Sequence, residues 1–247
     1  MTFSLFDIEI MKEVRFFYNP DVESGVLPEE ETVHAVRVLR LTEGDEIFLM
    51  DGKGTYFRAT ITEASRKHCC YRIVERIPQQ KQWNGHLHLA MAPTKNMDRT
   101  EWFAEKATEI GFDELSFINC RFSERTTVKD ERIEKILVSA MKQSHKPSLP
   151  VLGSMMDFDR FIGMEHKGRK YICHCYDENL PLLKDLLDGS TTTDDVLVMV
   201  GPEGDFSIDE VKKAEQAGFV SVSLGKSRLR TETAALVAVH LMHLAAE

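Results

Sequence analysis

The 247-residue sequence has no run of about 18 apolar residues, which argues against a membrane-spanning helix. Its opening residues include Asp7 and Glu9 and no basic segment, so they lack the features of a secretory signal. Met11 begins a stretch typical of a true start, so residues 1–10 are interpreted as a candidate extension. The five cysteines are an odd number without a CxxC pair, which argues against a disulfide framework and a zinc site. We expect a cytoplasmic protein without a metal.

Three motifs of nucleotide binding and nucleophilic catalysis are also missing. GKS at 225–227 matches the end of a phosphate-binding P-loop, but that motif requires a glycine where this chain has Val220. The sequence contains no GxGxxG for a dinucleotide and no GxSxG for a nucleophilic serine. Nucleotide-dependent enzymes, dehydrogenases and serine hydrolases therefore lose their main support.

A net charge of −9 argues against binding to nucleic acid by bulk electrostatics. Basic residues nevertheless gather locally. The stretch from Cys120 to Lys146 has seven Lys and Arg against four Asp and Glu, and KSRLR at 226–230 adds three cations. A nucleic acid would therefore have to be recognised by local patches.

The sequence divides into two regions that differ in their pattern of apolar residues. Residues 11 to about 80 contain short runs of β-branched and aromatic residues, and DGKG at 51–54 is typical of a hairpin turn. Apolar residues at helical spacing within 29–39 predict one short helix. We expect residues 1–80 to form a small β-barrel with a short helix.

Beyond the polar stretch IPQQKQWNG, apolar strands alternate with amphipathic helices. Two helix ends carry local signals, because Gly111 is placed for a C-cap and Ser207 with Glu210 forms a capping box. Such alternation predicts a mainly parallel sheet covered by helices over residues 81–247.

Ligands of α/β sheets bind beyond the carboxyl ends of the strands, and two loops there are unusual. VGPEGDFS at 200–207 packs two glycines and a proline between an apolar strand and a capped helix, so its backbone can approach a ligand. A tight strand-to-helix turn is the alternative interpretation. The second loop, SLGKSRLRTETA at 223–234, places three cations before a helix that is apolar on every face. Such a helix must be buried, in the core or against another subunit. Thr231 is the expected N-cap of this helix.

Other candidates are weaker. Cys173 and Cys175 share one strand face, as do His86 and His88, but packing is the favoured interpretation for both pairs. The polar loop NCRFSERTTVKDER, which begins at residue 119, is either plain surface or an anion contact at the sheet edge.

Taken together, several blocks of the chain resemble the RsmE family of SPOUT methyltransferases, over nearly the whole length from Met11. The C-terminal blocks are GPEG at 201–204, LG at 224–225, LRTETA at 229–234 and FSERT at 122–126; RFF at 15–17, HAVRVLR at 34–40 and DGKG at 51–54 resemble the family's N-terminal PUA-like domain.

The resemblance implies an α/β fold with two domains. Residues 1–80 would form a PUA-like RNA-binding β-barrel, and residues 81–247 a SPOUT methyltransferase domain with a parallel sheet and a C-terminal trefoil knot. It further implies S-adenosylmethionine as cofactor, N3 of a uridine in 16S ribosomal RNA of the small ribosomal subunit as acceptor, and a homodimer formed through the knotted domain and its last helix.

The resemblance also assigns roles to residues. Arg230 would orient the uracil or a phosphate, and Glu232 would orient Arg230 or take the proton. Arg37, Arg40, Arg121, Arg125 and Arg228 would contact RNA. The cofactor would be held by Cys173, His174, Cys175, Gly201, Pro202, Glu203, Gly204, Leu224, Gly225, Leu229, Arg230, Thr231, Thr233 and Ala234.

Two positions depart from the family pattern. Asp205 stands where a second glycine usually follows GPEG, and Lys142 stands where an acidic residue is common. The rival interpretation is an RNA-binding module with a SPOUT-like domain that only docks and does not catalyse.

Overall fold

The computed structural model describes residues 16–187 and 195–247; the candidate extension at 1–10 and Arg15 lie outside them. The chain divides into two compact units. The first contains the residues up to Lys81 together with Met141–Leu149, and the second contains Gln82–Ala140 and Pro150–Glu247. The short segment around residue 145 therefore folds with the N-terminal unit, which the alternation of strands and helices did not predict.

The first unit is built on a four-stranded sheet in the order β1-β2-β3-β4. Asp51 stabilises the predicted hairpin turn, because its Oδ1 accepts hydrogen bonds from the N–H groups of Lys53 (2.7 Å) and Thr55 (3.3 Å). Cys70 of the last strand also forms an isolated antiparallel bridge with Val26, which lies between the first strand and the helix. The strands are β1 Phe16–Tyr18, β2 Glu46–Met50, β3 Thr55–Ala64 and β4 Cys69–Pro78.

The predicted helix of the first unit is present between β1 and β2. It begins as α2 (Glu29–Val33) and ends as a π-turn over His34–Val38. Its inner face packs on the sheet in a core that includes Phe17, Ala35 and Leu49.

The second unit is a parallel six-stranded sheet, which confirms the predicted class of fold. Its strand order is β10-β8-β9-β5-β6-β7, and every neighbouring pair is parallel. The strands are β5 Leu87–Met91, β6 Glu114–Asn119, β7 Val151–Asp157, β8 Arg169–Cys173, β9 Val196–Val200 and β10 Val220–Val222.

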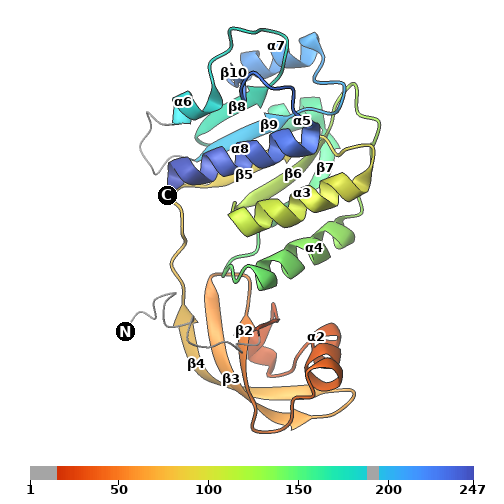
Figure 1. The fold of residues 1–247 in the computed structure, drawn as a ribbon, viewed down its shortest axis with the longest axis vertical. Helices are drawn as coiled ribbons and strands as arrows, with labels where there is room; N and C mark the ends of the chain where they lie inside the picture. Colours follow the sequence, from red (N-terminus) through yellow and green to blue (C-terminus); the bar gives the residue numbers. More distant parts are fainter. Residues whose placement is uncertain (1–15, 188–194) are drawn as a thin grey trace. The chain divides into compact units, whose positions relative to one another are not determined.

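Helices cover both faces of this sheet. On one face α8 lies beside α3 and across the central strands β5 and β9 (Figure 1). On the other face α5 and α7 close a core that contains Phe158, Val211 and Met199. The helices are α3 Met97–Ile110, α4 Asp130–Gln143, α5 Phe158–Ile162, α6 Leu183–Leu187, α7 Ile208–Gln216 and α8 Thr231–Ala246.

Two of the three helix ends that local signals predicted are correct. Gly111 caps α3 with a φ of 116°, and Ser207 with Glu210 forms the predicted capping box of α7. The prediction of Thr231 as N-cap of α8 is wrong by one residue: Arg230 has the extended backbone of the cap and Thr231 is already helical. Within one chain the core does not enclose α8 on every side, because His240 and Leu244 are exposed.

Candidate functional site

Five loops follow the carboxyl ends of the parallel strands, at the edge where α/β sheets bind ligands. Two of them are the glycine-containing loop after β9 and the cationic loop after β10. The others follow β5, β6 and β8, and direct bonds join these loops to one another.

Lys95 joins the loops after β5, β6 and β9. Its N–H donates to Glu203 Oε1 of the GPEG block (2.9 Å), and its carbonyl accepts from the Arg125 guanidinium (2.9 and 3.2 Å). Its ammonium pairs with Glu124 (2.6 Å), so both charged residues of the SER block engage the same residue. GPEG and SER, which are distant in sequence, therefore lie at one place.

Asp205 joins the loops after β8 and β9. Its Oδ2 accepts the Cys175 N–H (3.0 Å) and its Oδ1 accepts the Phe206 N–H (2.8 Å). In the opposite direction, the Tyr176 hydroxyl donates to the Phe206 carbonyl. Asp205 has a φ of 66°, in the left-handed region that glycine adopts freely and that Asp tolerates better than most residues. Asp205 therefore adopts a backbone that suits glycine and adds two hydrogen bonds to it.

The two glycines of the GPEG block permit close approach of backbone. A Cβ at Gly201 would lie 3.0 Å from the Phe206 nitrogen, and one at Gly204 would lie 3.0 Å from the Phe122 Cβ. Both glycines are therefore required by the packing of the loop, because a side chain there would meet Phe206 or Phe122.

The cationic loop after β10 is anchored at its beginning and open at its tip. Ser223 exchanges backbone hydrogen bonds with the loop after β8, at Pro181 and Leu183 (both 2.9 Å). Beyond it, Gly225 has a φ of 124° and nothing within 4 Å of its Cβ position. The side chains of Arg228 and Arg230 are exposed and have no hydrogen-bond or ion-pair partner in the described part of the chain, so both guanidinium groups are available to a ligand.

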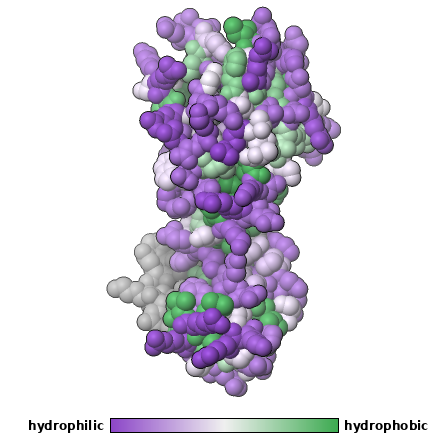
Figure 2. Space-filling view, turned by 90° about the vertical axis from the view of Figure 1, so that its right-hand side faces the viewer, coloured by the Kyte–Doolittle hydropathy of each residue, from purple (hydrophilic) through white to green (hydrophobic). Residues whose placement is uncertain are grey.

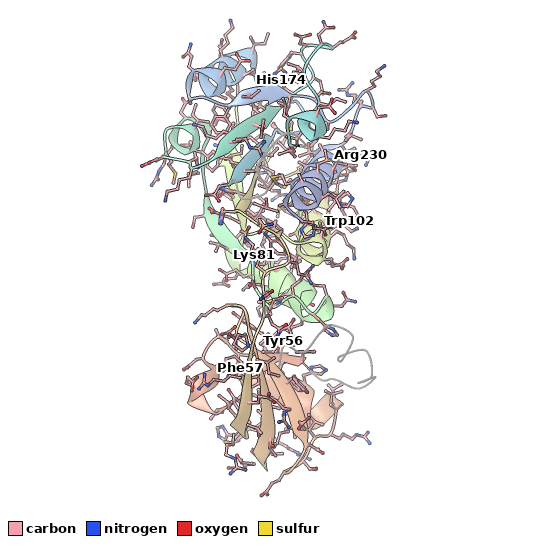
Figure 3. The ribbon with its side chains drawn as sticks, turned by 90° about the vertical axis from the view of Figure 1, so that its left-hand side faces the viewer. Tyr56, Phe57, Lys81, Trp102, His174 and Arg230 are labelled. Atoms are coloured by element: carbon pink, nitrogen blue, oxygen red, sulfur yellow. The ribbon has the colours of Figure 1, made fainter. Side chains whose placement is uncertain are left out.

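Glu232 lies in the first turn of α8 and is buried. Its Oε1 is 3.8 Å from Arg99 Nε on α3, while its Oε2 has no hydrogen-bond partner among the described residues. The positive end of a helix stabilises such a carboxylate. The structure therefore pairs Glu232 with Arg99, whereas Arg230 extends from the amino end of the helix (Figure 3).

His174 follows β8 and is buried, with an unpartnered ring nitrogen. Its Nδ1 accepts the Tyr176 N–H (3.3 Å), which assigns the ring proton to Nε2. Burial lowers the pKa of His174, so the ring is neutral near pH 7 and Nε2 is a buried donor without an acceptor in the described residues.

The neighbouring cysteines are unsuited to nucleophilic chemistry. Burial raises the pKa of the Cys173 thiol far above its ordinary value and also raises that of Cys175. Both are therefore neutral thiols near pH 7, and the thiolate is the nucleophilic form.

The two histidine positions near β5 lie at the opposite end of the sheet. His86 Nε2 contacts Glu114 Oε2 (3.1 Å), and His88 Nε2 contacts Ser116 Oγ (2.9 Å). The described residues contain no group of three metal-ligating side chains. The histidines thus have protein partners and lie away from the loops.

The structure brings most of the predicted site residues of the second unit to one edge. Those after β8, β9 and β10 are linked by the bonds above, with Arg125 joined to them through Lys95. The Arg121 side chain is exposed, and its N–H donates to Glu210 Oε1 (2.8 Å). Arg37 and Arg40 belong to the first unit.

Three residues of the site were missed from the sequence: Lys95, Arg99 and Tyr176. Lys95 and Arg99 stand near the start of a helix that the sequence located correctly, but no local pattern predicts their partners more than 25 residues away. Tyr176 follows β8 by three residues, and its position at the carboxyl end of a strand was the available signal.

Comparison with known proteins identifies the class. A family model described as an RNA methyltransferase domain matches residues 81–243, and one described as an RNA methyltransferase PUA domain matches residues 27–74. The fold and both regions are therefore those of an RNA methyltransferase with a PUA domain. More narrowly, the chain belongs to the ribosomal RNA small subunit methyltransferase E (RsmE) family.

Relatives with this name match the chain over most of their lengths. The enzyme from Synechocystis is 30% identical over 209 residues, covering 82% of this chain and 67% of the relative. That from Rickettsia conorii is 27% identical over 220 residues, covering 88% of each.

Solved structures agree. A probable rRNA-methyltransferase from Porphyromonas gingivalis has 41% identity and a TM-score of 0.86, covering 94% of this chain and 98% of that one. A ribosomal RNA small subunit methyltransferase E from Neisseria gonorrhoeae, bound to S-adenosyl methionine, has 26% identity and a TM-score of 0.82 with the same coverages.

Proposed function

We propose that this protein transfers the methyl group of S-adenosylmethionine to N3 of a uridine in the 16S ribosomal RNA of the small ribosomal subunit. Membership of the family supports methylation of ribosomal RNA with this cofactor. The observation that carries the proposal is that the GPEG block, the SER block and the cationic loop lie at one edge of the sheet. The side chain of Arg230, on the cationic loop, has no partner among the described residues.

The residues at this edge fit the cofactor. Gly204 is exposed on the loop after β9, and His174 Nε2 and Glu232 Oε2 are buried polar atoms that lack partners in the described structure. A ligand with both donors and acceptors, such as an amino acid joined to a nucleoside, can satisfy such groups. The loop residues at 173–175, 201–204, 224–225 and 229–234 would hold it. The cofactor supplies an electrophilic methyl group on a sulfonium.

The task of the protein is to hold the uracil in line with the methyl group and to accept the N3 proton. We assign orientation to Arg230, because its planar guanidinium is a donor fork for a carbonyl or phosphate oxygen. Glu232 is our candidate for the proton acceptor. Its link to Arg99 connects α3 with the start of α8.

Recognition of the RNA is assigned to basic residues of both units. In the second unit these are Arg121, Arg125 and Arg228, which stand on the loops after β6 and β10. The Arg125 guanidinium already donates to Lys95, so we assign it to holding the loops as well as to phosphate contact. In the first unit they are Arg37 and Arg40. As part of this proposal, residues 1–80 dock on the RNA and residues 81–247 catalyse the methyl transfer.

We further propose that the C-terminal segment is threaded into a trefoil knot and that two chains form a homodimer through the knotted domain and α8. The knot is supported by the path of the chain, which leaves edge strand β10, pairs at Ser223 with the loop after β8, and returns over β5 and β9 as α8. The dimer is supported by exposed Leu244 and half-buried Val237 on that helix.

The cytoplasm, where ribosomes assemble, is the proposed location. No helix in the described ranges is long and apolar enough to cross a membrane.

Calorimetric titration with S-adenosylmethionine separates this proposal from a SPOUT-like module that only docks on RNA. We expect the full chain to bind the cofactor and then to label under-methylated small ribosomal subunits with its methyl group. RNA binding without any heat of cofactor binding would favour the docking module and overturn the enzyme.

A further inference from the structure

An exposed phenyl ring stands in the loop after β6. Three aromatic side chains of the described residues are largely exposed, Trp102 (44%), Phe122 (46%) and Tyr176 (49%), and all belong to the second unit. Hydrophilic side chains predominate on the side of this unit that Figure 2 shows. Tyr176 is tied down by its hydroxyl, which donates to the Phe206 carbonyl. Phe122 has no polar atom on its side chain and no ring contact among the described residues, so its exposed side is open to a planar ligand.

The turn that carries Phe122 is fixed by its own hydrogen bonds and by packing. The Ser123 Oγ accepts the Cys120 N–H (2.9 Å), and the Ser123 N–H donates to the Cys120 carbonyl (3.0 Å). On its inner side the Phe122 side chain packs against Gly204 of the GPEG block, where an added Cβ would lie 3.0 Å from the Phe122 Cβ and 3.6 Å from its Cγ. The ring is thus held in place before any ligand binds, and a contact that is already ordered costs less conformational entropy on binding.

A short series of contacts joins the place of this ring to Arg230. Glu203, the neighbour of the glycine that the ring contacts, accepts the Lys95 N–H (2.9 Å) in the loop before α3. In the first turn of α3, Arg99 pairs with Glu232 (3.8 Å), which follows Arg230 by two residues. The same edge of the sheet therefore presents an apolar planar ring and a planar donor group that lacks a partner among the described residues.

The chemistry of the proposed acceptor explains why these two groups belong together. N3 of uracil lies on the edge that forms base pairs, so an enzyme that methylates it must turn the base out of its stack. The base then loses its neighbours, and proteins replace them with aromatic side chains on the face and hydrogen-bond partners on the edge. Cations beside the aromatic contact hold the strand, and Arg121 and Arg125 flank Phe122 in the sequence.

We propose that Phe122 is the platform on which the target uracil stacks, while Arg230 binds an oxygen on the edge of that base. Phe122 would thus bind and position the acceptor without taking part in proton or methyl transfer. The identity of the base rests on the proposed function. The exposure of the ring, the fixed turn and the contact with Gly204 are properties of the structure.

Phe122→Leu in the full chain tests this platform. Leucine keeps an apolar contact with Gly204 but removes the flat face, so kcat/KM for under-methylated small ribosomal subunits should fall about 10- to 100-fold. The dissociation constant for S-adenosylmethionine, measured by calorimetry, and the melting temperature should stay close to those of the unaltered protein. Phe122→Tyr keeps the flat ring and should retain nearly full activity. Trp102→Leu is the matched control, because Trp102 is similarly exposed but lies on α3, outside the loops that form the site.

The outcomes separate this inference from the proposed function. Unchanged kcat/KM in Phe122→Leu would overturn the platform. An equal fall in Phe122→Leu and Phe122→Tyr, or a matching loss of cofactor affinity, would show that the side chain only supports the GPEG loop, and would also overturn it. Failure of the unaltered protein to methylate small subunits would instead contradict the proposed function. The affinities for 16S ribosomal RNA then decide the inference: weaker binding by Phe122→Leu supports a stacked base, and equal binding overturns it.

Discussion

Replacement of Arg230 by alanine is expected to lower kcat for methyl transfer about 10²- to 10³-fold, the usual effect of removing one donor that is aimed at a reacting group. The side chain is exposed and has no partner among the described residues, so the variant should keep its melting temperature. Methylation of under-methylated small ribosomal subunits, followed with labelled cofactor, measures the loss.

Arg228→Ala is the matched control for this variant. Arg228 stands two residues earlier on the same loop, is also exposed and also lacks a hydrogen-bond or ion-pair partner in the described ranges. Loss of a phosphate contact should raise KM and leave kcat nearly unchanged. Full activity of Arg230→Ala, or an equal fall in kcat for both variants, would remove Arg230 from the chemistry.

Replacement of Asp205 by alanine is expected to weaken binding of S-adenosylmethionine by about 10- to 100-fold. The variant loses both hydrogen bonds of the carboxylate, to Cys175 and Phe206, and puts a residue that disfavours positive φ at 66°. The loops after β8 and β9 would then separate more readily. Calorimetry gives the dissociation constant, and hydrogen exchange at the Cys175 amide reports the loop directly.

Two further variants divide the effect at Asp205 into its causes. Asp205→Gly restores the backbone freedom typical of the family and removes only the hydrogen bonds, so its loss of affinity should be smaller than that of Asp205→Ala. Asp205→Asn keeps one acceptor oxygen and should lie closest to the unaltered protein. Wild-type affinity and unchanged exchange in Asp205→Ala would show that the tie between the loops has no role in cofactor binding.

The sequence predicted those parts of the fold that local interactions decide. The capping box at Ser207 and the C-cap at Gly111 were located because cap geometry depends on residues within one turn. β7 and α5 were not predicted. β7 is an edge strand in which no residue is fully buried, so its sequence pattern is weak. The membership of Met141–Leu149 in the first unit depends on contacts with Phe16 and Tyr56, which no local pattern encodes.

The loops of the candidate site were predicted from the sequence, but the hydrogen bonds and ion pairs that join them were not. GPEG and LRTETA were identified by resemblance, whereas the position of Lys95 at the junction of three loops depends on the register of the whole sheet. The two departures from the family pattern also became clear only in three dimensions. Asp205 satisfies a left-handed backbone, and Lys142 pairs with partly buried Glu31 inside the first unit.

The most direct test of the account is mass spectrometry of the modified nucleosides in 16S ribosomal RNA from a strain that lacks this protein. We expect 3-methyluridine to disappear from one position and to return when the unaltered gene is restored, but not when the Arg230→Ala variant is supplied. Unchanged 3-methyluridine in the RNA of the deletion strain would contradict the proposed function.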